Sequence, residues 1–316
     1  MPVCPICRSK CRFFLTIGNY IYCECHKCQT LFLHNGPKLR ELNSFYATSF
    51  SYEAGKTNEQ RIRQRSRIIL KNLKKLNPSG KTLLDVGSGY GYLLDEAHKF
   101  NVNAIGIEPS RNLFKHSVNK KVINIDLEDY FKRKPVKRFD FITLVHVIEH
   151  IKNPQKWLGI IRDLLNPGGI LFIETPNLDS HLFNFEKYYY TFLTPPEHLW
   201  IFSKYSFVRL LRKITDLKLI KHSTYSYPEH FMGILKKILV RKAKIPVLND
   251  LGIPERRDVL TSRSEGRAPT RVKNAVSSFF KRIKYLIIDK IFAKLLFRLL
   301  NIGNKGSFLE LYIKKI

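Results

Sequence analysis

Two pairs of cysteines near the start of the chain have the spacing of a metal site. Cys4 and Cys7 form one Cys-x-x-Cys pair, and Cys25 and Cys28 form a second pair after an interval of seventeen residues. Four thiolates at this spacing can surround Zn²⁺ tetrahedrally, with Zn–S distances of about 2.3 Å. Because four sulfur ligands leave no position open for water, such an ion would be structural.

All six cysteines of the chain lie within its first 28 residues. The first residues do not resemble a secretory signal peptide, so we expect a cytoplasmic chain, in which a disulfide framework is disfavoured. Cys11 and Cys23 leave the ligand set open, because either thiol could replace one of the four cysteines of the two pairs as a ligand. Only those four, however, have the Cys-x-x-Cys spacing. A zinc ribbon over residues 1–35 has little core of its own, so the metal would supply most of its folding free energy.

A glycine-rich turn is the second motif that could do chemistry. The short apolar run 83–86 leads into glycines at three alternate positions, Gly87, Gly89 and Gly91. Glycine lets a ligand approach the backbone because it has no Cβ. Glu108 ends the next apolar run, where its carboxylate is placed to accept hydrogen bonds from both hydroxyls of a ribose. With Asp126 at the end of a third run, these residues predict a nucleoside cofactor.

A parallel sheet would position these groups. Strand-like runs alternate with helical patterns, which predicts βαβ units. The runs lie at 83–86, 102–107, 122–126, 139–145 and 170–174. Ligands of such sheets bind beyond the carboxyl ends of the strands, which is where Asp85, Glu108 and Asp126 fall.

Together these motifs resemble class I S-adenosylmethionine-dependent methyltransferases. The resemblance covers roughly residues 79–227 and includes, besides the glycine turn, the fourth-strand stretch 139–150 and the helix–turn–strand stretch 164–173. The stretch 197–203 resembles a subset whose members often act on sugars or small metabolites, and in which N-terminal zinc ribbons recur. The resemblance implies an α/β fold with a Rossmann-like, doubly wound, seven-stranded sheet whose last strand is antiparallel.

The chain then divides into five expected parts. In chain order they are a zinc ribbon (1–35), a helical linker or lid (36–78), the methyltransferase core (79–228), a basic helical insertion with a mobile loop (229–304) and the last core strand (305–316). A capping box at 57–60 would open the linker helix, with one face formed by Ile62, Ile69, Leu73 and Leu76. Residues 217–225 would be the sixth strand, 246–271 the mobile loop, and 231–242 and 276–300 the helices beside it.

The resemblance also implies a cofactor-binding set. Its members lie at strand ends or in the turns that follow: Asp85, Gly87, Gly89, Gly91, Glu108, Asp126, Leu127, Val145 and His146. Asp85 would contact the methionine end of S-adenosylmethionine, and Glu108 the ribose. Asp126 and Leu127 would flank the adenine, although Asp126 has a simpler alternative as a turn residue.

Glu197 and His198 are the candidate catalytic pair. A base is needed when a methyl group is transferred to a hydroxyl or an acidic carbon. In related sugar C-methyltransferases a tyrosine precedes the matching Glu-His, but Pro195 stands at that position here, which argues against carbon methylation of a keto-sugar. The alternative for His198 is ordinary packing against the aromatic residues that follow it.

A second candidate cluster is His146, Glu149 and His150. Quinone O-methyltransferases resemble this stretch and hold a divalent ion there, but they carry Glu where His146 stands. Imidazole in place of a carboxylate would weaken a Mg²⁺ site. We therefore expect these side chains to line the cofactor pocket rather than to bind a metal.

The chain has a net charge of +29. Basic residues exceed acidic ones throughout the chain, and the excess per residue is larger towards its C-terminal end. The apolar, basic segment 276–300 carries too many charges to span a bilayer but suits an anionic membrane surface, or packing on its own domain or on a partner copy.

We predict a cytoplasmic enzyme, peripheral at the inner membrane face, that methylates a sugar, nucleotide sugar or polyprenyl-linked glycan. A quinone O-methyltransferase and an RNA methyltransferase are the alternatives, and the oligomeric state is left open.

Overall fold

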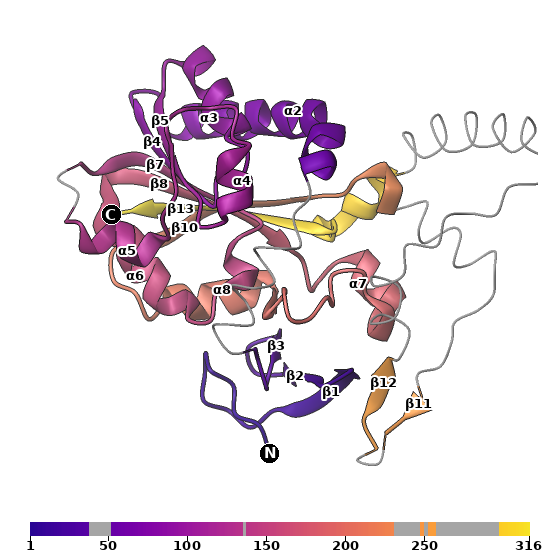
Figure 1. The fold of residues 1–316 in the computed structure, drawn as a ribbon. Coiled ribbons are helices and arrows are strands. Elements are labelled where there is room, and N and C mark those ends of the chain that lie inside the picture. Colours follow the sequence, from indigo (N-terminus) through magenta and orange to yellow (C-terminus); the bar gives the residue numbers. More distant parts are fainter. Residues whose placement is uncertain (38–51, 135–136, 231–246, 250–251, 257–296) are drawn as a thin grey trace, which may run out of the picture.

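The computed structural model describes residues 1–37, 52–134, 137–230, 247–249, 252–256 and 297–316. Two sheets organise these residues, a seven-stranded sheet in the body of the molecule and a six-stranded sheet at its base (Figure 1).

The seven-stranded sheet has the order β10-β13-β8-β7-β4-β5-β6. Its strands in chain order are β4 (Thr82–Val86), β5 (Asn103–Ile107), β6 (Val122–Ile123), β7 (Phe139–Val145), β8 (Leu165–Pro176), β10 (Leu217–Tyr225) and β13 (Phe308–Lys315). The pairs from β6 to β8 are parallel, whereas β13 runs antiparallel to both β8 and β10. The doubly wound sheet with an antiparallel last strand is thereby confirmed.

Helices cover both faces of this sheet. They are α2 (Tyr52–Leu76), α3 (Tyr92–Ala97), α4 (Arg111–Lys115), α5 (Leu127–Lys132), α6 (Pro154–Leu164), α7 (His181–Glu186) and α8 (Lys204–Leu211), with the short 3₁₀ turns η1 (His98–Phe100), η2 (Ile148–His150), η3 (Lys187–Tyr189) and η5 (Phe297–Asn304). Successive strand residues face opposite sides, so Leu83 packs in one core cluster with α2 and α3, whereas Leu84 packs in the other with α5, α6 and α8.

Three local expectations prove wrong. Helix α2 begins at Tyr52, so no helix opens at the predicted capping box. Ile62 is exposed, whereas Ile69 and Leu73 are buried, so the predicted apolar face does not extend to Ile62. Strand β6 ends at Ile123 because Asp126 already caps α5, its carboxylate accepting the Asp129 N–H at 2.8 Å.

The six-stranded sheet joins the N-terminal ribbon to two distant parts of the chain. Its order is β11 (Val247–Leu248), β12 (Pro254–Arg256), β1 (Arg12–Ile17), β2 (Tyr20–Cys25), β3 (Thr30–Leu33) and β9 (Trp200–Phe202). Strand β3 pairs with β9 of the core, and β1 pairs with β12. The predicted mobile loop is therefore wrong at 247–248 and 254–256, which form strands.

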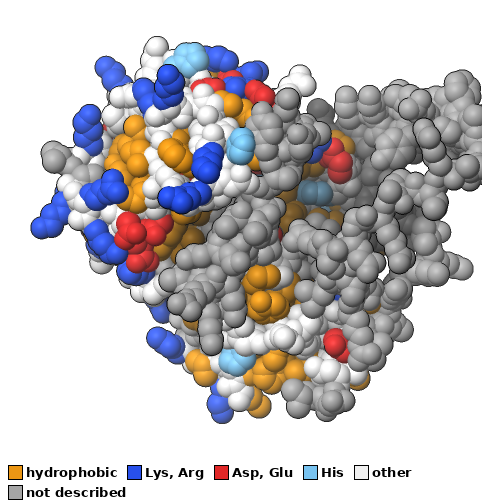
Figure 2. Space-filling model, in the orientation of Figure 1, with side chains coloured by type: hydrophobic (Ala, Val, Ile, Leu, Met, Phe, Trp, Pro, Cys, Tyr) orange, Lys and Arg blue, Asp and Glu red, His pale blue; other side chains and the backbone are white. Residues whose placement is uncertain are grey.

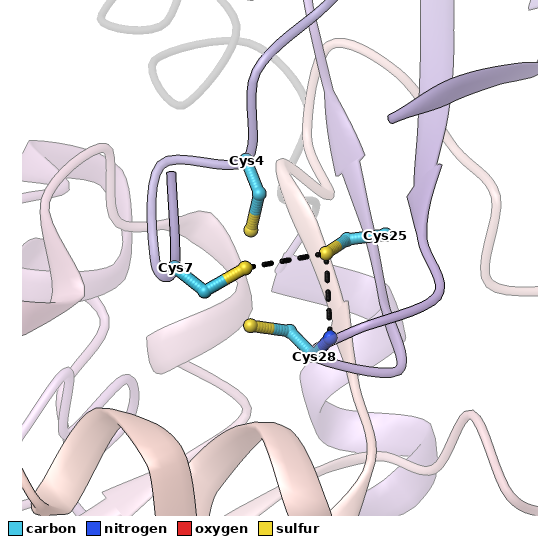
Figure 3. A group of neighbouring side chains, drawn as sticks. All are labelled: Cys4, Cys7, Cys25 and Cys28. Atoms are coloured by element: carbon cyan, nitrogen blue, oxygen red, sulfur yellow. Dashed lines mark hydrogen bonds between the residues drawn. The ribbon is translucent and has the colours of Figure 1, made fainter. Parts of the chain in front are cut away.

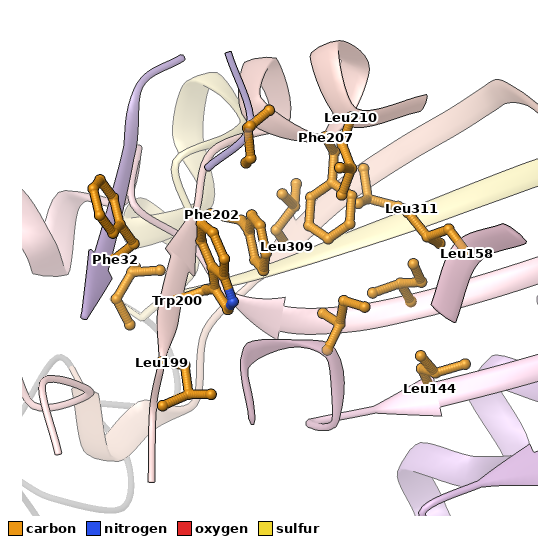
Figure 4. Close-up of a cluster of buried hydrophobic side chains, with 14 of the residues drawn as sticks. Phe32, Leu144, Leu158, Leu199, Trp200, Phe202, Phe207, Leu210, Leu309 and Leu311 are labelled. Carbon is orange, nitrogen blue, oxygen red and sulfur yellow. The ribbon is translucent and has the colours of Figure 1, made fainter. Parts of the chain in front are cut away.

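The ribbon and the core share one hydrophobic cluster (Figure 4). The Trp200 ring stacks on Phe202 at 5.6 Å, and Phe202 contacts Phe207 of α8 at 4.5 Å. From the ribbon, Phe32 lies 5.9 Å from Trp200. This continuous packing fixes the position of the ribbon on the core.

The proposed membrane-facing segment lies mostly outside the described residues. The helix predicted at 231–242 and residues 276–296 of the helix predicted at 276–300 lie outside the described residues, whereas Phe297–Asn304 forms the 3₁₀ turn η5. No helix in the described ranges has both the length and the apolarity for a membrane crossing. On the face drawn in Figure 2, Lys and Arg side chains are spread over the described surface rather than gathered in one patch.

Candidate functional site

Asp85 lies near the carboxyl end of β4, with only 4% of its surface exposed. Its Oδ1 accepts a hydrogen bond from Thr143 of the neighbouring strand β7 at 2.6 Å. Burial raises the pKa of Asp85 to about 7, although the Thr143 hydrogen bond opposes the shift. A carboxylate held in this way favours a cationic partner, such as the amino group of a bound amino acid moiety.

The turn after β4 has backbone conformations that only glycine adopts without strain. Gly87, Gly89 and Gly91 have φ values of 70°, 53° and 77°. A Cβ at Gly87 would lie 2.5 Å from a methyl group of Val147, so no side chain fits there. A Cβ at Gly89 would meet nothing within 4 Å, so this glycine faces open space into which a ligand can come close to the backbone.

Glu108 closes this cradle from the end of β5. Its Oε2 accepts the Gly89 N–H at 2.9 Å, and its Oε1 accepts the Ser110 N–H at 2.8 Å. Burial raises the pKa of Glu108. Since a carboxylate oxygen has two lone pairs, Glu108 retains acceptor positions for ribose hydroxyls, and the donor-side set (Asp85, the glycine turn and Glu108) fits S-adenosylmethionine.

The remaining predicted cofactor residues lie along the same edge. Asp126 is the N-cap of α5, and Leu127 in its first turn is fully buried. Val145 ends β7 and is half-buried. Their contacts with a cofactor stay predictions.

His146 follows β7 with a φ of 55° and faces two carboxylates. Its Nδ1 lies 3.4 Å from Glu149 Oε1, and its Nε2 lies 3.1 Å from Glu174 Oε1. Although burial opposes the charged form, these two partners raise the pKa of His146 to about 10. The two carboxylates thus favour the imidazolium form of His146, and its contact with a cofactor stays a prediction.

Sequence reasoning missed the buried ion network beside His146. Arg65 of α2 pairs with Glu174 of β8, with Nε 2.9 Å from Oε2, and also with Glu310 of β13. The Tyr225 ring lies 4.0 Å below the Arg65 guanidinium, and its hydroxyl donates to Glu174 Oε1 at 2.5 Å. Although burial opposes the shift, the charge of Arg65 and the hydrogen bond from His146 lower the pKa of Glu174 to about 2.

Aromatic rings surround Phe308 at the start of β13. The Phe308 ring cluster comprises Phe308 with His146, Phe192, Tyr225, Tyr227 and His230. All five neighbouring rings have centroids within 5.7 Å of the Phe308 centroid. Phe308 itself is buried, whereas its neighbours Phe192 and Tyr227 are half-buried and can offer ring faces to a sugar or an aromatic acceptor.

His198, which was predicted as a base, lies at the edge of this cluster. Its Nδ1 is 2.6 Å from the Phe192 carbonyl oxygen, so Nδ1 carries the proton and Nε2 is left as an acceptor. Burial lowers the pKa of His198 to about 4, which keeps Nε2 unprotonated at neutral pH. One ligand atom each from Glu149, His150 and His198 lies within 4.8 Å of the others.

Glu197 occupies a different position from its predicted partner. Its backbone carbonyl accepts a hydrogen bond from His150 Nδ1 at 2.9 Å. Its carboxylate adds to the effect of burial in raising the pKa of Tyr22 in the ribbon. The catalytic role of Glu197 stays a prediction.

The ribbon holds the backbone on which His198 stands. Tyr22 of β2 donates its hydroxyl hydrogen to the His198 carbonyl oxygen at 2.6 Å. The Leu33 N–H donates to the next carbonyl, that of Leu199, at 2.8 Å, where β3 and β9 meet. The ribbon thus contacts the backbone of His198 and of the residue after it directly.

The four predicted zinc ligands converge in the ribbon (Figure 3). Their sulfur atoms all lie within 4.8 Å of one another, and Cys7 Sγ is 3.5 Å from Cys25 Sγ. Zinc–sulfur bonds of about 2.3 Å place tetrahedral sulfur atoms about 3.8 Å apart, so this group fits Zn²⁺. The group does not include Cys11, which instead donates to the Ser9 carbonyl at 3.4 Å, or Cys23.

Comparison with known proteins identifies a family that the chain matches. A family described as "Methyltransferase domain" matches residues 57–222, more than half of the 316-residue chain. A ubiquinone biosynthesis O-methyltransferase of Coxiella burnetii (strain Dugway 5J108-111) is 32% identical over 126 residues, which cover 37% of this chain and 51% of that protein.

A second curated relative carries the same name. A ubiquinone biosynthesis O-methyltransferase of Bradyrhizobium sp. (strain ORS 278) is 30% identical over 113 residues, covering 34% of this chain and 45% of that protein. The chain thus spans about half the length of the curated relatives that it matches. A crystal structure of a SAM-dependent methyltransferase from Archaeoglobus fulgidus has a TM-score of 0.47 and 17% identity, covering 84% of this chain and all (100%) of that one.

Proposed function

The chain belongs to the methyltransferase-domain family; from that premise we propose that it transfers a methyl group from S-adenosylmethionine to a hydroxyl group of a sugar, nucleotide sugar or polyprenyl-linked glycan. The observation that carries the proposal is the unprotonated Nε2 of His198 beside the Phe308 ring cluster. A neutral imidazole next to stacking surfaces can accept a hydroxyl proton from a ring-shaped acceptor.

Each part of the site has a task in this proposal. When bound, S-adenosylmethionine supplies a methyl group activated by the sulfonium. The glycine turn and Glu108 hold its nucleoside, and Asp85 faces its amino acid end. His198 takes the hydroxyl proton on Nε2; the Glu149 carboxylate favours the imidazolium that forms, whereas burial and the nearby His150 oppose it. Most of the acceleration comes from holding the reacting atoms about 3–3.5 Å apart in line.

The ribbon supports this site from outside. We propose that Zn²⁺ occupies the group formed by Cys4, Cys7, Cys25 and Cys28, where it holds the ribbon that carries Tyr22. Its role is structural, since the four thiolates complete a tetrahedral shell.

Transfer of radiolabelled methyl into fractionated host extract tests the proposal. We expect label in nucleotide-sugar or lipid-linked glycan fractions. We expect His198→Ala to lower turnover about 10²- to 10⁴-fold while leaving the affinity for S-adenosylhomocysteine unchanged. His116→Ala, an exposed histidine on α4's C-cap, is the matched control. Label in RNA alone, or in no fraction, would overturn the proposal, and unchanged turnover would remove His198 from the mechanism.

A quinone or other lipid-like acceptor is the second candidate. The names of the relatives favour it, and so does the grouping of Glu149, His150 and His198, which could hold a divalent ion. This candidate predicts label in the lipid extract, in a quinone fraction, with a rate that rises on addition of Mg²⁺. It also predicts that His150→Ala removes the Mg²⁺ response.

A further inference from the structure

A buried arginine from a distant part of the chain reaches the segment that carries His198. Arg256 is the last residue of β12, and only 8% of its surface is exposed. Strand β12 lies beside β1 of the ribbon, with Arg256 opposite Ile17 in their parallel register (Figure 1). This strand lies within the predicted mobile loop 246–271, and the sequence alone assigns no role to Arg256.

The Arg256 guanidinium donates hydrogen bonds to two backbone carbonyls of the acceptor segment, which we define as residues 187–198. Its Nη2 lies 3.1 Å from the Leu193 oxygen, and its Nη1 lies 3.5 Å from the Tyr188 oxygen. A guanidinium presents its donors in a rigid fork, so one side chain can hold two acceptors at once. Because β12 also contacts η3, Arg256 closes an interface that the two segments already share.

The Leu193 carbonyl stands between two carbonyls that hold His198. The Phe192 oxygen is 2.6 Å from His198 Nδ1, and the Thr194 oxygen accepts the His198 backbone N–H at 3.2 Å. Each peptide group is planar and shares a Cα atom with the next, so a displacement of the Leu193 carbonyl shifts the carbonyls on both sides. Arg256 thus holds the middle one of three consecutive peptide groups, and the other two fix the imidazole and the backbone of His198.

The same arginine lies within electrostatic reach of the contact between the ribbon and His198. Burial raises the pKa of Tyr22, and the charge of Arg256 opposes that rise, whereas the charge of Glu197 adds to it. The Tyr22 hydroxyl is the group that donates to the His198 carbonyl oxygen. Strands β2 and β12 therefore both hold the acceptor segment by its backbone, at points close to each other.

We propose that Arg256 is a positioning residue for methyl transfer, whose forked hydrogen bonds lock the acceptor segment in the geometry that aims His198 Nε2 at the acceptor hydroxyl. The proposal rests on the function proposed above, in which His198 is the base, and adds a residue of the expected insertion 229–304 to those on which turnover depends. Reacting groups must be held about 3–3.5 Å apart and aligned, so a small displacement of His198 lowers the rate without weakening donor binding.

The variant Arg256→Ala of the full-length, zinc-loaded protein tests the proposal. Turnover is measured as radiolabelled methyl transferred to the extract fraction that accepts it. We expect kcat to fall about ten- to a hundredfold, with less than about a threefold change in the apparent KM of the acceptor fraction and in the affinity for S-adenosylhomocysteine. Arg12→Ala is the matched control, since its guanidinium on the neighbouring strand β1 is 65% exposed and paired with Glu24, and should leave kcat unchanged.

Added guanidinium separates positioning from a general loss of stability. In Arg256→Ala, guanidinium ions at non-denaturing concentrations can enter the space of the lost group and donate to the same carbonyls, so kcat should recover in part. Urea has a similar shape but no charge, so its hydrogen bonds are weaker and kcat should respond less. Arg256→Lys keeps the charge but lacks the fork, so it should have an intermediate kcat, and it decides the question if Arg256→Ala does not fold. An equal response to the two additives, or an unchanged kcat in Arg256→Lys, overturns the proposal.

Failure of the positioning role and failure of the proposed function give different results. Label in RNA alone, or in no fraction, overturns the function whatever the state of Arg256. Where sugar fractions take label and His198→Ala loses turnover, a kcat in Arg256→Ala equal to that in Arg12→Ala overturns the positioning role alone. Combining Arg256→Ala with His198→Ala should lower the residual rate no further than His198→Ala does, and a further tenfold loss would show that Arg256 acts on something other than His198.

Discussion

The donor side and the acceptor side of the sheet edge are built in different ways. On the donor side, Gly89 and Glu108 are hydrogen-bonded to each other and stand nineteen residues apart in one βαβ unit. On the acceptor side, the ion pair of Arg65 and Glu310 joins residues separated by 245 positions, and the bond from Tyr22 to His198 spans 176. One side is therefore local in sequence, and the other is assembled from the whole chain.

This difference assigns separate tasks to the parts of the molecule. A local βαβ unit holds its cofactor geometry whatever is attached elsewhere, whereas the acceptor side depends on α2, β13 and the ribbon. Changes in those distant parts should alter acceptor turnover and leave donor affinity almost intact. Four perturbations test this separation of donor and acceptor sides. They are given in order of decreasing expected effect.

Removal of the proposed zinc ion should have the largest effect. A structural zinc contributes on the order of 10 kcal/mol or more to the folding of a small domain, so chelation should unfold the ribbon and release the His198 backbone. We expect methyl transfer to be abolished while the affinity for S-adenosylhomocysteine, measured by calorimetry, changes less than about threefold. Restored turnover after Zn²⁺ is added back is the control. Loss of both properties together would contradict the separation of the two sides.

The substitution Arg65→Met should have the next largest effect. It leaves Glu310 without a buried cation and Glu174 with His146 alone, and the loss of one partner of a buried ion pair typically costs about 3–5 kcal/mol. We expect denaturant unfolding at pH 7 to show this loss, and Arg61→Met, whose ion pair with Glu229 is exposed, to cost less than about 1 kcal/mol.

The pH dependence of Arg65→Met follows from the low pKa of Glu174. A carboxyl whose folded pKa is depressed from 4.5 to about 2 stabilises the fold above pH 4.5, and that contribution is lost as the pH falls through about 2. The unaltered chain should therefore lose stability over this window more steeply than Arg65→Met does. A difference between the two that stays constant from pH 7 to pH 2.5 would exclude Glu174 as the partner that matters.

The same contrast between local and distant contacts explains which parts of the molecule could be predicted from the sequence. Strands were predicted at 217–225 and in the last core segment 305–316, where the structure has β10 and β13, and Glu108 and the glycine turn were assigned to one ligand site because both follow from one βαβ pattern. The end of β6 was placed too late, since an apolar run does not show that Asp126 is engaged as a helix cap.

The acceptor side offered weaker signals. Glu174 interrupts the apolar strand β8, and a charge in such a strand implies a partner, but nothing local identifies that partner as Arg65 or Tyr225. Strand β12 was read as loop because of its composition, yet the free edge of β1 pairs with it, and Pro254 occupies the first strand position, where no ladder hydrogen bond is needed.

Glu108→Gln probes the donor side in isolation. Both carboxylate oxygens accept backbone N–H groups, from Gly89 and Ser110. An amide has only one oxygen, so its NH₂ would face a second donor, at a cost of about 1–3 kcal/mol. We expect S-adenosylhomocysteine to bind about ten- to a hundredfold more weakly, with little change in turnover at saturating donor. Asp163→Asn, on the exposed surface of α6, is the control. Unchanged donor affinity would remove Glu108 from the cofactor site.

Tyr22→Phe is the mildest perturbation and the most specific to the ribbon. It deletes only the hydroxyl that donates to the His198 carbonyl, a bond worth about 1 kcal/mol, so we expect kcat to fall about fivefold. Donor affinity and zinc content should not change, because neither depends on that hydroxyl. Tyr205→Phe is the matched control, since its exposed hydroxyl accepts a hydrogen bond from Arg209 on α8.

The outcome separates two roles of the ribbon. If kcat falls in Tyr22→Phe but not in Tyr205→Phe, the ribbon positions His198 through its backbone. The effect of Tyr22→Phe should then vanish in the His198→Ala background, because no base is left to position. If Tyr22→Phe and His198→Ala instead act additively, the ribbon supports the acceptor side through its packing on Trp200 and not through the hydroxyl.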